Sequence, residues 1–175
     1  ALYDPAKDSV SDYIKRILQK SQYTIGRTAR LSIFNDIKTV IKRLSKNGIG
    51  EFGDWNCFEG NEYSAITDYF LIKNSSLYMP NNLAYYITGK KDYIEKIELV
   101  LNINYQQDKE MAMAKFKDIT LLTCKSLSIN CPQDLVDAMD QLSEYCLKFD
   151  TYSLELQCVP SGKVETWTFS IITQI

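Results

Sequence analysis

Apolar and polar side chains alternate over most of residues 93–105. The apolar members are Tyr93, Ile97, Leu99, Leu101, Ile103 and Tyr105, and the polar members are Lys96, Glu98, Asn102 and Asn104. Because successive side chains of a strand point to opposite faces, this run predicts a strand with one buried face and one face in water. Such a strand is typical of an antiparallel sheet covered on one side.

Further strands are expected on both sides of this run. Turn residues divide the preceding segment into expected strands at 51–58, 63–73 and 83–88, which with 93–105 form an antiparallel meander. Residues 63–73 are apolar on both faces, so we expect them to lie centrally in the sheet. Alternation from Tyr152 to Cys158, a Pro160-Ser161-Gly162 turn and the apolar residues Trp167, Phe169 and Ile171 predict a C-terminal hairpin.

Helical periodicity predicts four helices. The first covers 9–23, and the second follows Thr28 and ends at Asn47-Gly48, a helix-terminating pair. The third covers 108–126, and Cys131-Pro132 opens the fourth. The apolar stripe of the fourth helix is expected to be Leu135, Met139, Leu142 and Cys146.

The expected order is therefore ααββββααββ, with helices and strands segregated along the chain. This order predicts the α+β class, with one mostly antiparallel sheet and helices packed on one face. The length of 175 residues suits a single domain over 1–175, and no internal repeat is present. No apolar run reaches 18 residues, and the first residues lack a signal peptide pattern. We expect a soluble chain, either cytoplasmic or exported after loss of its signal peptide.

Charge divides the chain into two parts. Residues 1–50 carry a net charge of +6, and residues 51–175 carry −8. One interpretation is a basic helical part resting on an acidic part made of the sheet and the later helices. The other is a surface for nucleic acid or an anionic membrane, as in a viral matrix-like protein. Its candidate residues are Arg27, Arg30, Lys38, Lys42, Arg43 and Lys46.

The absence of histidine removes histidine-based catalytic triads and metal sites from consideration. The sequence contains no phosphate-binding loop, and Gly48–Gly53 lies between a helix and a strand, which is the wrong context for a dinucleotide fingerprint. No cofactor or metal is expected. A hydrolase that uses a metal and carboxylates stays a second alternative, with Glu59, Glu62, Asp68, Asp92 and Glu95 beside Lys96 as its groups.

Five cysteines stand at positions 57, 124, 131, 146 and 158. Their spacing does not favour a structural zinc site. Cys124 and Cys131 would meet where one helix ends and the next begins, and Cys146 would approach Cys158. The alternative is five free thiols in a reducing compartment.

Twelve tyrosines are present, and many lie in the meander. Because this part of the chain is acidic, stacking on nucleic acid bases is disfavoured there, whereas tyrosine and tryptophan are common anchors of protein interfaces. Trp55, Tyr85 and Tyr86 are the candidate partner-binding residues. The favoured function is a non-catalytic protein-binding module, such as an immunity protein or a secretion chaperone. The element order is similar to that of type III secretion chaperones, apart from the paired N-terminal helices and one extra strand.

Overall fold

Antiparallel strands form one sheet in the computed structural model, which describes residues 31–72 and 79–173. The strands are β1 (Asn56–Glu59), β2 (Glu62–Ile66), β3 (Phe70–Ile72), β4 (Asn81–Lys90), β5 (Tyr93–Ile103), β6 (Tyr145–Lys148), β7 (Tyr152–Ser161) and β8 (Val164–Thr173). Their order across the sheet is β1-β2-β4-β5-β8-β7-β6, and β3 also pairs with β4.

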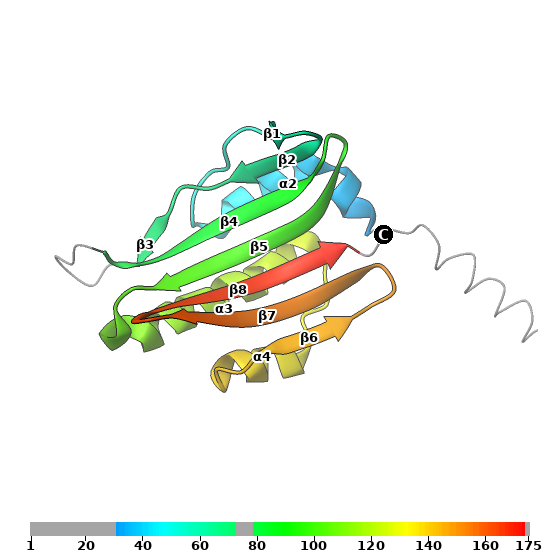
Figure 1. Cartoon of the computed structure of the whole chain (residues 1–175). Coiled ribbons are helices and arrows are strands. Elements are labelled where there is room, and N and C mark those ends of the chain that lie inside the picture. The colour runs from blue at the N-terminus through cyan, green and yellow to red at the C-terminus, as the bar shows by residue number, and fades with distance from the viewer. Residues whose placement is uncertain (1–30, 73–78, 174–175) are drawn as a thin grey trace, which may run out of the picture.

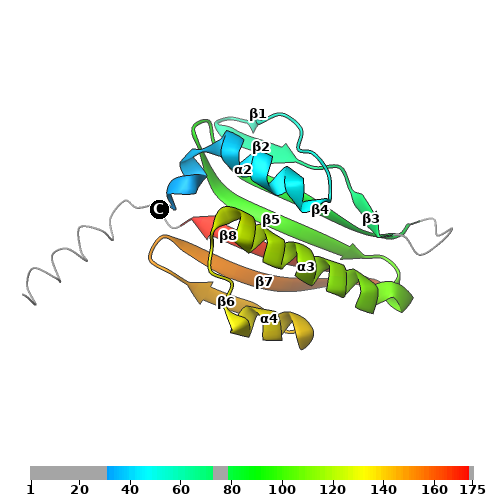
Figure 2. The same ribbon diagram turned by 180° about the vertical axis from the view of Figure 1, so that it is seen from behind.

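Three α-helices among the described residues lie on one face of this sheet. They are α2 (Ile37–Leu44), α3 (Lys109–Leu127) and α4 (Gln133–Asp140). Figure 1 looks onto the opposite face, and Figure 2 shows the helices from behind. The predicted α+β class with an antiparallel sheet is therefore confirmed. None of the described helices combines the length and apolar character that crossing a bilayer requires.

The core lies between the sheet and these helices. Alternate residues of the central strands point into it and are almost fully buried: Leu83, Tyr85, Ile87, Ile97, Leu99, Leu101, Ile103, Trp167, Phe169 and Ile171. They pack with helical residues such as Val40, Phe116 and Leu135 in one cluster. Because burial of each large apolar side chain contributes about 1.5–3 kcal/mol, this cluster is the main source of stability.

The alternation in β5 is confirmed from Ile97 to Ile103, but it changes phase near the start of the strand. Ile94 is buried and Tyr93 is half-exposed. The register shifts between Thr88 and Gly89 of the partner strand, which is a β-bulge. A Cβ at Gly89 would lie 2.3 Å from the carbonyl oxygen of Tyr93, so the bulge requires glycine.

The N-terminal part differs from the expected pair of helices. The predicted helix 9–23 lies outside the described residues. The second helix begins at Ile37, because the Asp36 side chain accepts a hydrogen bond from the Thr39 N–H at 3.0 Å and caps it there. Residues 32–35 form a 3₁₀ turn instead. α2 ends at Leu44, and a 3₁₀ turn over Ser45–Asn47 follows it. The helical segment as a whole ends at Gly48 as predicted, because Gly48 adopts a left-handed φ of +82°.

The segment expected as one central strand at 63–73 is two short strands near an edge of the sheet. β2 and β3 both pair with β4, and β1 lies outside β2. The break falls at Thr67, whose N–H donates to the Tyr85 carbonyl at 3.1 Å and whose hydroxyl accepts from the Tyr85 N–H at 3.0 Å. Of the strand expected at 51–58, only β1 forms at its end, with Phe52 in an isolated bridge to Thr67.

The last part of the chain contains one strand more than expected. α4 ends at Asp140 because Leu142 takes a left-handed φ of +53°, and the Ser143 N–H donates to the Ala138 carbonyl at 2.9 Å. Leu135 and Met139 are buried as predicted, whereas Leu142 is exposed. Cys146 lies in the unexpected strand β6. The predicted helix at 108–126 and the C-terminal hairpin are confirmed as α3 and as β7 with β8.

Candidate partner-binding surface

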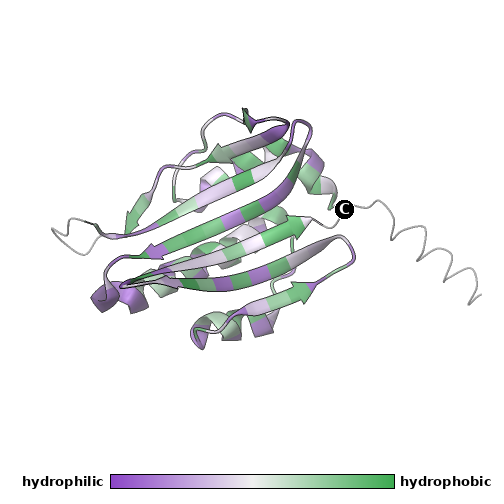
Figure 3. Cartoon of the chain, viewed as in Figure 1, coloured by the Kyte–Doolittle hydropathy of each residue, from purple (hydrophilic) through white to green (hydrophobic). Residues whose placement is uncertain are grey.

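The face of the sheet that none of the described helices covers is called the open face. Its central side chains are Asn82, Ala84, Tyr86, Thr88, Lys96, Glu98, Val100, Asn102, Thr166, Thr168 and Ser170. Figure 3 shows hydrophobic and hydrophilic residues alternating along β5 and β7, as expected where one face is buried and the other is in water.

Polar side chains on the open face bind one another. The Asn102 amide donates to the Asn82 side-chain oxygen at 3.0 Å, and the Thr166 hydroxyl donates to the Asn102 oxygen at 3.1 Å. Lys96 forms an ion pair with Glu98 at 3.0 Å. The centre of the open face is therefore largely polar, and several of its polar side chains are paired with one another.

One edge of the open face is apolar and aromatic. Ile66, Tyr69 and Leu71 are 51%, 57% and 44% exposed. Ile66 lies opposite Tyr86 in the register of β2 and β4, and the Tyr69 and Tyr86 hydroxyls form a hydrogen bond of 3.2 Å. Leu71 lies opposite Asn82, on the same face. We call Ile66, Tyr69, Leu71 and Tyr86 the edge patch.

Acidic side chains flank the edge patch. Asp68 is exposed beside Tyr69, and Glu98 lies opposite Tyr86 in the register of β4 and β5. Partial burial, the hydrogen bond with Tyr69 and the charge of Glu98 together raise the pKa of Tyr86 to about 12. The Tyr86 phenol therefore stays neutral at physiological pH, where its hydroxyl can donate a hydrogen bond.

The structure separates the three predicted partner-binding residues. Tyr86 belongs to the edge patch. Tyr85 is fully buried, and its hydroxyl accepts from the Asn47 amide at 2.9 Å and binds the Thr123 hydroxyl. Adjacent residues of a strand point to opposite faces, so Tyr85 is a core residue that a partner of the folded domain cannot contact.

The Trp55 side chain is not available to a partner on the open face. Its indole packs against the core, stacks on Tyr63 with ring centroids 6.1 Å apart, and donates to the Lys91 carbonyl at 3.3 Å. Tyr63 is one strand position from Ser64, which lies opposite Thr88 of the open face. The Trp55–Tyr63 stack therefore forms on the helix-covered side, away from the edge patch.

The candidate basic residues fall into two groups. Arg27 and Arg30 lie outside the described residues. Lys38, Lys42 and Lys46 are exposed at intervals of four along α2 and the turn that follows, so they share one side. Arg43 is also exposed, and its guanidinium donates to the Ser126 carbonyl at 3.0 Å.

The candidate carboxylates do not form one site. Glu62 begins β2 and Asp68 follows its end, a separation of about 20 Å along an extended chain. Lys90 contacts both Glu62 and Glu95. Asp92 lies in the turn between β4 and β5, and Glu59 ends β1. In residues 31–72 and 79–173, no group of three or more acidic or cysteine side chains could hold a metal ion.

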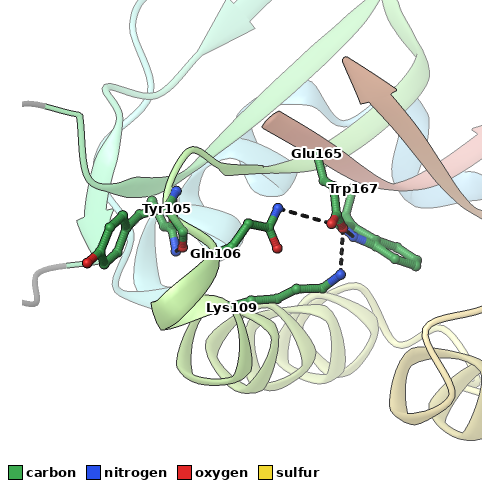
Figure 4. Close-up of polar contacts among 6 residues, drawn as sticks. Tyr105, Gln106, Lys109, Glu165 and Trp167 are labelled. Atoms are coloured by element: carbon green, nitrogen blue, oxygen red, sulfur yellow. Dashed lines mark hydrogen bonds and ion pairs between the residues drawn. The ribbon is translucent and has the colours of Figure 1, made fainter. Parts of the chain in front are cut away.

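A polar cluster joins the start of α3 to the sheet. The Glu165 carboxylate accepts from Lys109 at 2.7 Å, from the Gln106 amide at 3.0 Å and from the Trp167 indole at 3.2 Å. Figure 4 shows these donors converging on Glu165. They lower the pKa of Glu165, Lys109 most strongly. A carboxylate held by three donors is suited to fastening β8 to the start of α3 rather than to accepting a substrate proton.

A groove of about 760 Å³ lies beside this cluster, between α3 and α4. Met113, Ala114, Met139 and Leu142 are its apolar members. Its two lysines are engaged, Lys109 with Glu165 and Lys117 with Asp140 at 2.6 Å. Among the described residues that line it, the groove thus presents no unpaired cation for an anionic ligand.

The two predicted cysteine pairs have different outcomes. Cys124 and Cys131 influence each other's pKa, which is lowered to about 7 for Cys131 and raised for the buried Cys124. Cys146 lies opposite Glu155 in the register of β6 and β7, and Cys158 is three positions further along β7, on the other face. Cys146 and Cys158 therefore do not approach each other.

Sequence reasoning missed Ile66, Tyr69 and Leu71. The available signal was the two-sided apolar character of residues 63–73, which we attributed to a buried central strand. The same pattern arises when one side faces the core and the other forms an exposed apolar patch. The chain matches no protein-family model, no curated protein and no solved structure in the comparisons with known proteins.

Proposed function

We propose that this domain is a non-catalytic protein-binding module and that the edge patch is its docking surface. One observation carries the proposal: three large apolar side chains, Ile66, Tyr69 and Leu71, are about half exposed beside one another on the open face. Clustered exposed apolar residues mark interaction sites on soluble proteins, whereas single ones do not. Immunity proteins and secretion chaperones are the roles of this type that we favour.

The aromatic members give the edge patch the character of an interface centre. Tyr69 and Tyr86 are held together by their hydroxyl groups, so little side-chain freedom is lost when a partner covers them. Tyrosine is enriched among residues whose truncation costs 2 kcal/mol or more of binding energy, roughly 30-fold in affinity. The polar centre of the open face would then form the wet rim of the interface.

The charges beside the edge patch indicate the chemistry of the partner. Asp68 is exposed, Glu98 is half-buried, and Lys96 is paired with Glu98 at 3.0 Å. The complementary surface is a protein with apolar side chains at its centre and lysine or arginine at its margin. The net charge of −8 over residues 51–175 favours the same partner.

The test combines a double substitution in the edge patch with a matched control. Ile66→Ser with Leu71→Ser removes two exposed apolar side chains and leaves the core intact. Val159→Ser is the control, because Val159 is 61% exposed and lies on the same open face, opposite Thr166. Its strand, β7, lies toward the other edge of the sheet, away from the edge patch. Each full-length variant is used to recover the stoichiometric partner from the source organism at high salt, and affinity is then measured by calorimetry.

We expect the double variant to bind the partner at least 30-fold more weakly and the control to bind as the parent does. Equal binding by all three proteins contradicts the proposal. Light scattering of the parent protein alone measures whether it forms a dimer in solution. A dimer that the double variant dissociates would assign the edge patch to contact between copies and would overturn the proposal of a different partner.

A second candidate function is binding to an anionic surface through α2. The observation in its favour is the row of Lys38, Lys42 and Lys46, all exposed on one side. None of these lysines has an ion pair among the described residues. Binding of this kind is electrostatic and falls steeply as salt is added. Binding through the edge patch, in contrast, is expected to resist added salt.

A further inference from the structure

The groove between α3 and α4 has an apolar surface that is partly open to solvent. Met113 and Met139 are its buried apolar members, and Ala114 and Leu142 are its exposed ones. Leu121 is 36% exposed and lies seven residues after Ala114, hence on the same side of α3. The apolar surface therefore continues from the groove toward the C-terminus of α3.

Two unpaired acidic side chains border this surface. Glu110 and Asp118 line the groove, are exposed and form no ion pair with any residue that the structure describes. The two lysines of the groove are each paired with a carboxylate, so these two acids give the groove an excess of negative charge. The complementary ligand combines apolar side chains with lysine or arginine.

Residues 9–23, which precede the described part of the chain, have this complementary pattern in their sequence. Their apolar residues recur at helical spacing: Val10, Tyr13, Ile14, Ile17 and Leu18. Lys15, Arg16 and Lys20 lie outside this stripe, and Asp12 is the only acidic residue of the segment. A helix of this length is marginal by itself in water and depends on packing of its apolar face. The predicted helix therefore requires an apolar surface to pack on.

The described chain begins where this segment can reach the groove. Figure 2 shows the start of the described chain, in blue, at the same end of the sheet as the C-terminus of α3. The connection from Tyr23 to Leu31 can span about 26 Å, and Asp118 lies about 14 Å along the helix axis from the C-terminus of α3. A helix over residues 9–23, about 22 Å long, can thus lie along α3 and extend into the groove.

We propose that residues 9–23 form a helix that docks in the groove between α3 and α4 of the same chain. The apolar stripe of this helix covers the exposed apolar side chains of the groove, and its lysines lie beside Glu110 and Asp118. The groove is on the helix-covered side of the sheet, so this contact is separate from the edge patch on the open face.

Hydrogen exchange of the full chain, followed by mass spectrometry of its peptides, tests this contact. Amides of residues 9–23 should exchange at least tenfold more slowly in the parent than in Glu110→Lys with Asp118→Lys, because the new lysines repel the basic segment. The matched control is Glu51→Lys with Asp54→Lys, which changes the net charge equally at two exposed positions before β1. The control should leave the exchange of residues 9–23 unchanged.

Cross-linking with a carbodiimide locates the contact, because this reagent couples an amine directly to a carboxylate that touches it. We expect the monomeric parent to contain links from Lys15 or Lys20 to Glu110 or Asp118. Links from these lysines to other carboxylates alone, or no links at all, contradict the proposed position of the helix.

Substitutions in the segment and in the edge patch separate this contact from the proposed function. Ile14→Ser with Ile17→Ser removes apolar side chains of the segment but keeps its charges, and it should abolish the links and speed the exchange of residues 9–23. Ile66→Ser with Leu71→Ser, in the edge patch, should leave the links and the exchange as they are in the parent.

Three exchange results would overturn the proposal. The first is fast exchange of residues 9–23 in the parent. The second is slow exchange that the groove substitutions leave unchanged, since the segment would then pack elsewhere. The third is slow exchange that is lost on dilution, or links found only between two copies, which would assign the groove to the segment of a second copy. None of these outcomes bears on the edge patch.

Discussion

Tyr85 and Tyr86 are neighbours in β4, and the sheet gives them opposite surroundings. Tyr85 is fully buried beneath the helices and bound to Asn47 and Thr123, whereas Tyr86 lies on the open face and binds Tyr69. The two residues have the same side chain and the same propensity for strands. The comparison teaches that availability to a partner depends on which face the helices cover, a property that neither residue carries by itself.

The largest expected effect is a difference in the free energy of unfolding between substitutions on the two faces. Tyr85→Ala should lower the free energy of unfolding by about 4 kcal/mol, because it leaves a cavity and an unpaired Asn47 amide. Tyr86→Ala should lower it by less than about 1 kcal/mol, since the side chain is already in contact with water. Urea denaturation followed by circular dichroism measures both. Similar losses for the two variants would mean that the open face is covered in solution.

A smaller effect concerns Glu165, which fastens β8 to α3 at the rim of the covered face. Its pKa lies below the ordinary value of 4.5, mainly because of Lys109. The stabilisation is therefore present above about pH 4.5 and is lost as the pH falls through the lower folded pKa. Glu165→Gln should cost about 1 kcal/mol at pH 7 and progressively less below pH 4.5 or so.

Urea denaturation at pH 7, 4 and 3 follows this change for Glu165→Gln. The matched control is Glu155→Gln, on the open face, which accepts only long hydrogen bonds of 3.5 and 3.3 Å. It should change stability by less than about 0.5 kcal/mol at pH 7. A Glu165→Gln cost that does not shrink on acidification would show that the carboxylate charge is not the stabilising feature.

The smallest expected effect on stability comes from the exposed lysines of α2 and the turn that follows it. Replacement of Lys38, Lys42 and Lys46 by glutamine should change stability by less than about 0.5 kcal/mol each, because these side chains are solvated. If the edge patch is the functional surface, the substituted protein retains its partner, and the parent does not bind vesicles containing phosphatidylserine at physiological salt. Vesicle binding by the parent that the triple substitution and added salt both abolish would favour the second candidate function.

Local patterns predicted the elements whose partners lie close in sequence. The alternation of residues 97–103, the periodicity of α3 and the C-terminal hairpin were recognisable because each depends on spacing within one segment. The C-terminus of α4 and the N-terminus of α2 were less predictable. A left-handed Leu142 and a capping Asp36 decided them, and neither residue type strictly requires that role.

The candidate site was only partly predictable. Tyr86 was identified from its position in an aromatic strand, but Tyr85 was selected with it and belongs to the core. The apolar side chains of Ile66, Tyr69 and Leu71 favour a buried central strand when the sequence is considered alone. The same apolar side chains form the exposed edge patch in the structure. Apolar character alone does not distinguish burial in a core from exposure at a docking surface.

The sequence by itself determined the α+β class and the alternating strands, because periodicity follows from local backbone geometry. The tertiary structure alone decided that β2 and β3 lie near an edge, that Tyr85 is buried while Tyr86 is accessible, and that Cys146 and Cys158 face apart. The physical reason is that a sequence pattern specifies which residues share a face. Which face is covered depends on contacts between segments far apart in the chain.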